Sequence, residues 1–325
     1  MILYRPFQNN DVPGLATLWN RGLPDRSVVH PLSGHLFDRL VINQCIFDRN
    51  GLIVALDQAN RVVGFVHAGF GPVELSGPSH KLDHALGTIA MLVTDPDANG
   101  SEISLQLVQL ALEYLKNKGA KVIYAGGQSP LNPFYWGLYG GSEFGGILLE
   151  HRQFHRTVEQ TGFEPVSQAI LLELDLGKSE VKDPRTLLTR RQYQVFIEED
   201  ALLPNWWESQ ALHGFHPNRY ELRAKQGGPT LAEAWTFEMG TELPATDRLT
   251  YRGMFHLDVD PGHRRRGLGR LLLSECLKHA RSQMIDRFCV QTMSTNVPAL
   301  ALYRATGFST LSEAILYRQT SGNPA

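Results

Sequence analysis

The chain has 325 residues, of which 42% are hydrophobic and 20% charged, a composition typical of globular proteins and long enough for two domains of roughly 150 residues each. A formal net charge of −2 and a pI near 6.6 argue against a dedicated nucleic-acid-binding protein. The sequence contains neither a long apolar run, a secretory signal nor cysteines in CxxC spacing, so it predicts a cytoplasmic protein without a membrane span, a disulfide framework or a cysteine-rich zinc site.

The first half alternates short apolar runs with amphipathic segments. A helix is expected to begin at Asn10 or Asp11, because Pro13 then lies in the first turn, where proline is favoured. A second helix is expected at 105–116, where Leu107, Ala111 and Leu115 recur on one face. Strands are expected at 2–7, 52–56, 61–69, 87–93 and 121–125.

The second half repeats this order. Two apolar runs around the turn Gly227-Gly228-Pro229 predict a hairpin, and an amphipathic helix is expected at 268–280. Strands are expected at 219–225, 231–239, 251–259 and 288–292.

Two further features indicate an internal repeat. Thr161-Gly162-Phe163 and Thr306-Gly307-Phe308 are each followed, five residues later, by Ala-Ile-Leu. Asp95-Pro96 and Asp260-Pro261 each follow a predicted strand and precede a predicted helix. The repeat therefore covers half the chain, and the first copy carries an insertion around 129–141.

The polar stretch 177–191 has no apolar period and is the predicted linker. We expect a first domain at 1–176 and a second at 192–325. Within the linker, Arg190 and Arg191 are expected to be solvated.

The segment Val259 to Arg270 has the features of an anion-binding loop. It joins a strand to a helix, so backbone N–H groups and the positive end of the helix dipole converge on one point. Gly267 and Gly269 allow an anion to approach the backbone closely, and the neighbouring arginines add charge-assisted contacts. Neither a GxxxxGK[ST] loop nor a GxGxxG loop is present, so the pattern favours a pyrophosphate over those two nucleotide sites.

This loop resembles that of the GNAT superfamily of N-acyltransferases, which reads [Arg/Gln]-x-x-Gly-x-[Gly/Ala] after a strand ending near Val-x-Pro. Here Arg264-Arg265-Arg266-Gly267-Leu268-Gly269 follows Val259-Asp260-Pro261. A second signature of the family, Asn followed by Ala, Leu-Tyr and Gly-Phe, matches Asn296 to Phe308. The resemblance implies an α/β fold of two tandem GNAT-type domains, each with a mixed, mostly antiparallel sheet flanked by helices.

The resemblance also implies roles for individual residues. The backbone of Leu257 and Val259 would pair with the pantetheine arm of acetyl-coenzyme A, and Asn296 would contact the same arm. Tyr303 would act as the acid that protonates the leaving thiolate, although an aromatic residue at this spacing also fits a packed core. The pyrophosphate would be held by the loop residues Arg264, Arg265, Arg266, Gly267, Leu268, Gly269 and Arg270.

The base that deprotonates the acceptor is left open. His256, Asp258 and Glu238 are the candidates. By strand alternation, His256 and Asp258 point away from the face that carries Phe255, Leu257 and Val259, which favours a structural role for both.

The first copy departs from the family at its loop. Residues 95–104 contain no arginine, a single glycine and three acidic residues, and Val158 stands where Tyr303 stands in the second copy. We therefore expect chemistry in the second domain only. The aromatic insertion at 130–146 is either a packed loop, which we favour, or a ligand-stacking surface, and Trp206-Trp207 either contacts substrate or lies in the core. The pairs His80/His84 and His151/His155 lack a third ligand, so no metal site is expected.

The expected function is transfer of an acetyl or other acyl group from coenzyme A to a primary amine of a small molecule or peptide. The tandem layout is similar to that of the mycothiol synthases. The alternative is a non-catalytic acyl-coenzyme-A sensor or partner-binding protein. No nucleic-acid or membrane partner is expected, and the sequence makes no prediction about oligomeric state.

Overall fold

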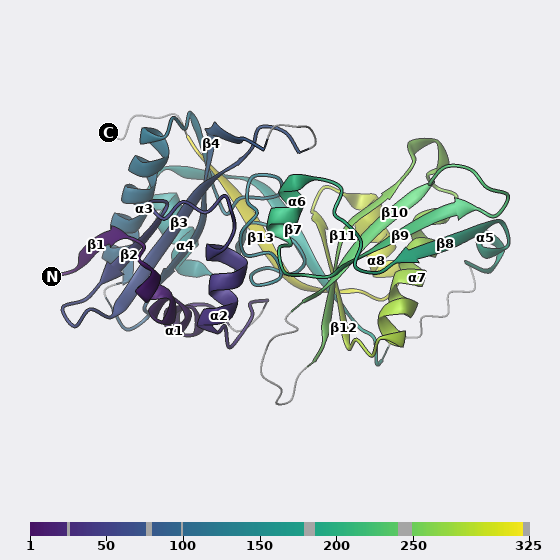
Figure 1. The fold of residues 1–325 in the computed structure, drawn as a ribbon, viewed down its shortest axis with the longest axis horizontal. Coiled ribbons are helices and arrows are strands. Elements are labelled where there is room, and N and C mark those ends of the chain that lie inside the picture. Colours follow the sequence, from purple (N-terminus) through teal and green to yellow (C-terminus); the bar gives the residue numbers. More distant parts are fainter. Residues whose placement is uncertain (25–26, 76–79, 99, 179–185, 240–248, 321–325) are drawn as a thin grey trace. The chain divides into compact units, whose positions relative to one another are not determined.

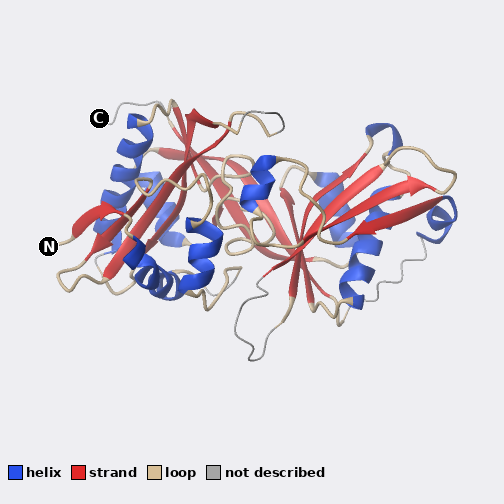
Figure 2. Cartoon of the chain, viewed as in Figure 1, coloured by secondary structure: helices blue, strands red, loops and turns tan. Residues whose placement is uncertain are grey.

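The structure is a computed structural model, and it describes all residues except 25–26, 76–79, 99, 179–185, 240–248 and 321–325. The chain forms two compact units. The first contains Met1–Ile170, Pro204–Gly214 and Ser312–Ala325, and the second contains Leu171–Leu203 and Phe215–Leu311. Each unit is a sheet with helices packed on it (Figures 1 and 2). None of the described helices is long and apolar enough to span a bilayer.

The sheet of the first unit is mixed. Neighbouring strands are antiparallel from β1 to β4, whereas β4 and β5 are parallel. A parallel pair needs a crossover, which α3 (Gly100–Asn117) supplies. The strands are β1 (Leu3–Pro6), β2 (Leu52–Leu56), β3 (Val62–Pro72), β4 (Leu82–Thr94), β5 (Val122–Ala125) and the short β6 (Ile147–Leu148).

Helix α3 packs on β2, β3 and β4, with Leu107, Ala111 and Leu115 fully buried, as the apolar spacing predicts. It begins five residues earlier than expected. Helix α1 starts at Val12 with Pro13 in its first turn, which confirms that prediction. The other helical segments of this unit are η1 (Asn9–Asp11), α1 (Val12–Gly22), α2 (Gly34–Phe37), η2 (Asp38–Ile42), α4 (Arg152–Gln160) and α6 (Trp206–Ala211).

The second unit repeats this plan. Its strands are antiparallel from β8 to β11, and β11 and β12 are parallel across the crossover helix α7 (Leu268–Ser282). The strands are β8 (Tyr193–Glu198), β9 (Pro217–Ala224), β10 (Ala232–Met239), β11 (Tyr251–Val259) and β12 (Arg287–Met293). The remaining helical segments are α5 (Thr186–Gln192), η3 (Pro261–His263) and α8 (Val297–Ala305).

The predicted linker contains a helix. Residues 179–185 lie outside the described residues, but α5 (Thr186–Gln192) covers the end of the predicted 177–191 stretch. The expectation that Arg190 is solvated is wrong, because its guanidinium pairs with Glu275 and donates to Ser274 Oγ at 3.2 Å, both on α7. A boundary between domains in this stretch stays a prediction.

Two long strands have residues in both units. β7 (Phe163–Asp175) begins in the first unit, and its residues from Leu171 onward belong to the second, where β7 is the neighbour of β12. β13 (Ser309–Gln319) begins in the second unit, and its residues from Ser312 onward belong to the first. There Tyr317 pairs with Ala125 of β5. The last strand of each repeat thus completes the sheet formed by the other repeat.

The aromatic insertion of the first unit is packed, as favoured from the sequence. Phe134, Tyr135, Trp136 and Tyr139 are all buried. Tyr135 is held by a 2.8 Å hydrogen bond between its hydroxyl and Nδ1 of His67, which itself is buried on β3. The insertion is therefore part of the core of this unit rather than an exposed stacking surface.

Two buried histidines make the stability of this unit depend on pH. Burial lowers the pKa of His67 and of His151 from 6.5 to about 3. Both imidazoles stay neutral in the folded protein at a pH where the unfolded chain binds a proton. The contribution of each histidine to the free energy of unfolding is therefore fully present above pH 6.5. It is lost as the pH falls from 6.5 towards 3, and at pH 5 the loss is about 2 kcal/mol for each histidine.

We predict that the free energy of unfolding in urea is lower at pH 5 than at pH 7.5, and that His67→Gln reduces this difference because glutamine does not titrate. Tryptophan fluorescence measures both values. An equal pH dependence in wild type and variant would contradict the buried, neutral state of His67.

Candidate functional site

The site begins where β11 runs into the loop that precedes α7. The Asp260 carboxylate accepts from the backbone N–H of Gly262 and interacts with His263 Nδ1, both at 2.9 Å. The hydrogen bond from His263, together with that of Gly262, holds the pKa of Asp260 below its usual value. These contacts close the turn at η3 and fix the direction in which the loop leaves the strand.

The three consecutive arginines have different surroundings. Arg264 folds back on the strand, where its Nε donates to the carbonyl of Val259 at 3.0 Å and its Nη2 lies 3.3 Å from Asp258. Arg265 and Arg266 are exposed and have no ion-pair partner in the described part of the chain. Arg264 thus orders the loop, and the other two leave their charge available to a ligand.

Gly267 is the residue before the first turn of α7 and adopts φ +80°. This left-handed conformation favours glycine, and no side chain caps the helix at this point. The N–H groups of the first turn of a helix have no partner within the helix, so they and the helix dipole favour a bound anion. Gly269 is the second residue of α7, and a Cβ there would meet Val259, Leu257 and Leu302 at ordinary distances of 3.4 to 3.7 Å.

A β-bulge at His256 overturns the alternation expected for β11. Trp235 pairs with Phe255, but the next residue back, Ala234, pairs with Leu257, which leaves His256 unmatched at φ +53°. Paired residues share a face of the sheet, and adjacent residues of β10 point to opposite faces. Phe255 and Leu257 therefore lie on opposite faces, and the prediction that they share one is wrong.

The bulge coincides with the end of a ladder. Strand β11 pairs with β12 from Tyr251 to Met254, whereas its pairing with β10 continues to Val259. Among the described residues, the last part of β11 thus has a strand neighbour on one side only. Leu257 and Val259 lie in this part, half-buried, with their side chains beside Gly269 of α7.

Helix α8 follows β12 and brings the second predicted motif to the same place. Asn296 caps the helix by accepting from the N–H of Ala299 at 3.3 Å, and its Nδ2 donates to Thr292 Oγ1 at 3.0 Å. Tyr303 is 5% exposed, and its ring centroid lies 5.7 Å from that of Phe308. The neighbouring Leu302 meets Gly269, so α8, the start of α7 and the end of β11 converge.

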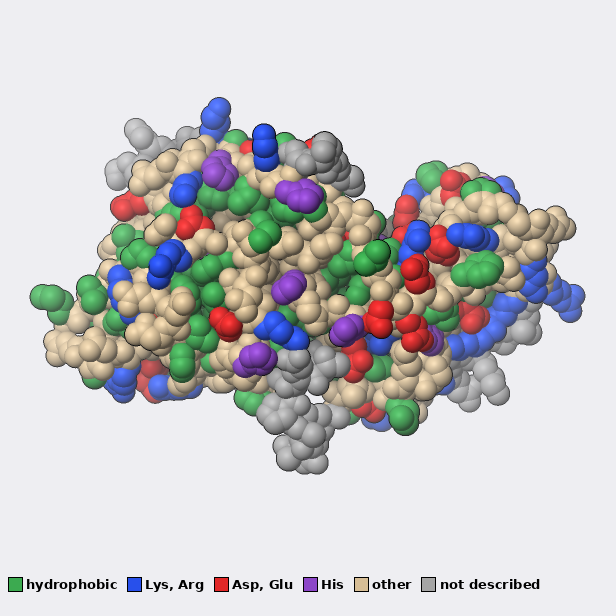
Figure 3. All heavy atoms as spheres, viewed as in Figure 1, with side chains coloured by type: hydrophobic (Ala, Val, Ile, Leu, Met, Phe, Trp, Pro, Cys, Tyr) green, Lys and Arg blue, Asp and Glu red, His purple; other side chains and the backbone are tan. Residues whose placement is uncertain are grey.

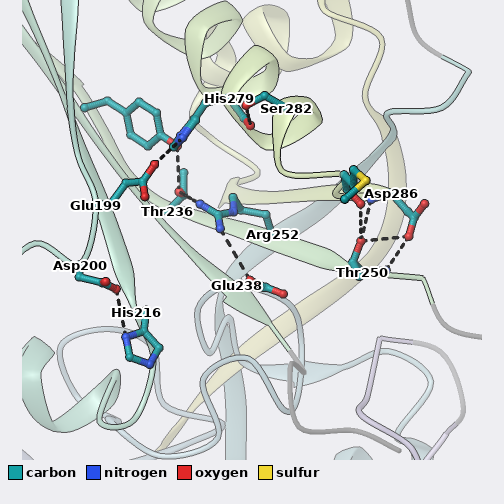
Figure 4. Close-up of polar contacts among 12 residues, drawn as sticks. Glu199, Asp200, His216, Thr236, Glu238, Thr250, Arg252, His279, Ser282 and Asp286 are labelled. Atoms are coloured by element: carbon teal, nitrogen blue, oxygen red, sulfur yellow. Dashed lines mark hydrogen bonds and ion pairs between the residues drawn. The ribbon is translucent and has the colours of Figure 1, made fainter. Parts of the chain in front are cut away.

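Behind this region a buried arginine is held by a chain of hydrogen bonds, which Figure 4 shows. Arg252 on β11 is buried, and its Nη1 donates to Thr236 Oγ1 at 3.4 Å. Thr236 in turn lies 3.5 Å from the hydroxyl of Tyr220, which is 2.8 Å from His279 Nδ1 on α7. No sequence pattern indicated a role for this arginine, because it lies in an apolar strand pattern.

The three candidate bases lie in different settings. Glu238 lies 3.9 Å from Arg252 Nη2, and Asp258 pairs with Arg264. His256 is exposed at the bulge, next to the end of the β11–β12 ladder. Among the described residues, no group of three His, Cys, Asp or Glu side chains is arranged to hold a metal ion.

The first repeat has the same backbone features around its corresponding loop, but different side chains. Strand β4 has a bulge at Ala90, and its ladder with β5 ends at Ile89. Asp95 and Asp97 of its loop pair with Arg21 at 3.2 and 2.7 Å, whereas the loop of the second repeat carries the exposed Arg265 and Arg266. Strand residues 89–93 are fully buried, and the insertion packs on β3 and β4.

The profile of the acetyltransferase (GNAT) family matches residues 18–144 and 195–308, one segment in each repeat. The chain belongs to the GNAT acetyltransferase family. The predicted fold class and tandem layout are thereby confirmed, and the protein is an acyltransferase.

Named relatives are N-acetyltransferases. The N-alpha-acetyltransferase RimI of Mycobacterium tuberculosis is 29% identical over 132 residues, which cover 41% of this chain and 77% of that protein. Mycothiol acetyltransferase of Clavibacter sepedonicus is 27% identical over 191 residues, 52% of this chain and 60% of the relative. A tandem GNAT protein from the clavulanic acid biosynthesis pathway is similar in fold along the whole length of both chains, with a TM-score of 0.70 at 13% identity.

We predict that Gly267→Ala lowers the free energy of unfolding by about 1–2 kcal/mol, because the Cβ of alanine is too close to the backbone carbonyl oxygen in the left-handed conformation. Gly269→Ala is the matched control, since its Cβ makes only ordinary contacts. Urea unfolding of both variants checks this, and equal stabilities would contradict the strained geometry at Gly267.

Proposed function

We propose that the second repeat transfers an acetyl group from acetyl-coenzyme A to a primary amine of a small molecule or peptide. The single observation that carries the proposal is the convergence of an uncapped α7 N-terminus, exposed arginines and an unpaired strand edge within one unit. A family that uses acetyl-coenzyme A fits this arrangement.

The donor fits the site in two parts. Its diphosphate meets the N–H groups of Arg265 to Arg270 and the positive end of α7, with Arg265 and Arg266 adding charge. Its pantetheine arm, which carries amide groups, lies along Leu257 and Val259, where β11 has no neighbour on the β12 side among the described residues. The arm then adds backbone-type hydrogen bonds to an open edge, and Asn296 flanks it from α8.

In the chemical step, the amine nitrogen attacks the thioester carbon, the C–N bond forms and the C–S bond breaks. Tyr303 gives its proton to the departing thiolate and regains one from the nitrogen. The products are the N-acetyl compound and coenzyme A. The place of Tyr303 supports this role, because the neighbouring Leu302 on α8 meets Gly269 at the start of α7.

The acceptor is a neutral primary amine at the moment of attack. Relatives acetylate different partners: two are named as acetyltransferases of alanine in the ribosomal protein bS18, and others as mycothiol acetyltransferases. We propose a small molecule or a peptide as the acceptor of this chain.

We predict that Tyr303→Phe lowers kcat by about a hundredfold while leaving the Kd for acetyl-coenzyme A unchanged, because general acid catalysis contributes roughly 10²–10⁴. Thiol release with a panel of small and peptide amines measures kcat, and calorimetry measures Kd. Binding of acetyl-coenzyme A without thiol release for any amine would favour a non-catalytic sensor.

We also predict a stoichiometry of one coenzyme A per chain. The loop of the first repeat carries Asp95 and Asp97 and has no arginine between 95 and 104, so it disfavours phosphate. Calorimetric titration measures the stoichiometry directly. Two equivalent sites would contradict the proposal that the first repeat does not bind the donor.

A further inference from the structure

Helix α5, which the sequence presented as linker, lies against the start of α7. A Cβ built on Gly267 would lie 3.4 Å from the hydroxyl oxygen of Thr189. Gly267 is the residue that opens the uncapped first turn of α7. A side chain from α5 therefore reaches the proposed phosphate loop.

The Thr189 hydroxyl has no hydrogen-bond partner among the residues the structure describes, although the side chain is half-buried. A partly buried hydroxyl without a partner costs free energy unless a ligand or water satisfies it. Its position beside the proposed phosphate loop indicates which ligand group it can hydrogen-bond. A hydroxyl can donate to a phosphate oxygen, whereas the positive end of α7 offers it no acceptor.

The position of Thr189 is fixed by its neighbours on α5. Arg190 pairs with Glu275 and donates to Ser274 Oγ, two turns into α7, and Thr186 is 3% exposed. These contacts fasten one face of α5 to α7. The hydroxyl is thus held at the loop before any ligand arrives, which lowers the ordering cost of binding.

Positive charge gathers on the same part of the unit. Figure 3 shows Lys and Arg side chains over the end of the second unit where Figure 1 draws α5. Arg191 lies in the last turn of α5 and is exposed, as are Arg265 and Arg266 of the loop. Exposed positive charges of this kind attract a phosphate.

We propose that α5 forms one wall of the coenzyme site and that the Thr189 hydroxyl donates a hydrogen bond to the diphosphate of the bound coenzyme. Thr189 is then a binding residue supplied from outside the two family motifs. This inference rests on the proposed function, since it names a further contact to the same donor.

The test compares Thr189→Val with Thr189→Ser. Valine keeps the shape of threonine but removes the hydroxyl, and serine keeps the hydroxyl. We expect Thr189→Val to weaken coenzyme A binding about tenfold, because a hydrogen bond to a charged group is lost, and Thr189→Ser to bind within about twofold of wild type. Thr17→Val is the matched control, since Thr17 is an exposed helical threonine of the first unit. Calorimetry on the full chain gives each Kd, and thermal unfolding verifies folding.

A second probe, dephospho-coenzyme A, identifies the group that the hydroxyl contacts. It retains the diphosphate and lacks the 3′-phosphate, so we expect Thr189→Val to weaken its binding by the same factor. A loss confined to coenzyme A would assign the hydroxyl to the 3′-phosphate and overturn the inference, as would unchanged binding of both probes. If the wild-type protein binds no coenzyme A, both the proposed function and this inference are wrong.

Discussion

The parallel pairing of β11 with β12 ends at Met254 and Val290, and the candidate site depends on this. A strand with neighbours on both sides has no backbone groups left for a ligand. Once the ladder ends, the last part of β11 has a neighbour only in β10 among the described residues, and the same strand leads directly into the loop before α7. The bulge at His256 increases the local twist at this point and turns Leu257 and Val259 towards α7. The end of the β11–β12 ladder and the bulge beside it thus leave one edge of β11 open and orient Leu257 and Val259 towards α7.

The two repeats share these backbone features but differ in the side chains around them. Both have a bulge on the strand before the crossover helix and a parallel ladder that ends beside it. In the first repeat, the insertion buries Tyr135 against His67, and Arg21 is neutralised by Asp95 and Asp97. In this repeat, apolar burial and internal ion pairs occupy the region that corresponds to the candidate site of the second repeat.

Much of this was predictable from the sequence, because local patterns encode local structure. The apolar spacing gave α3 and α7, and glycines and arginines at fixed positions marked the loop. The bulge was not predictable, since an extra residue in a strand leaves the alternation of residue types ambiguous and Phe255 and Leu257 are both apolar. Helix α5 was missed because it is short and is held by Arg190 contacts to a helix distant in sequence. Arg252 was missed because tertiary partners, not neighbours in sequence, satisfy it.

Strands β7 and β13 have a consequence for how the protein is made. Ser312 to Gln319, near the end of the chain, belong to the first unit, where Tyr317 pairs with β5. The ribosome therefore synthesises most of the first unit long before the strand that completes it. That sheet keeps an open edge at β5 until β13 has been translated, and open edges are sites of mispairing. The first repeat cannot be removed by a simple truncation, because each half of the gene encodes a strand that the other half needs.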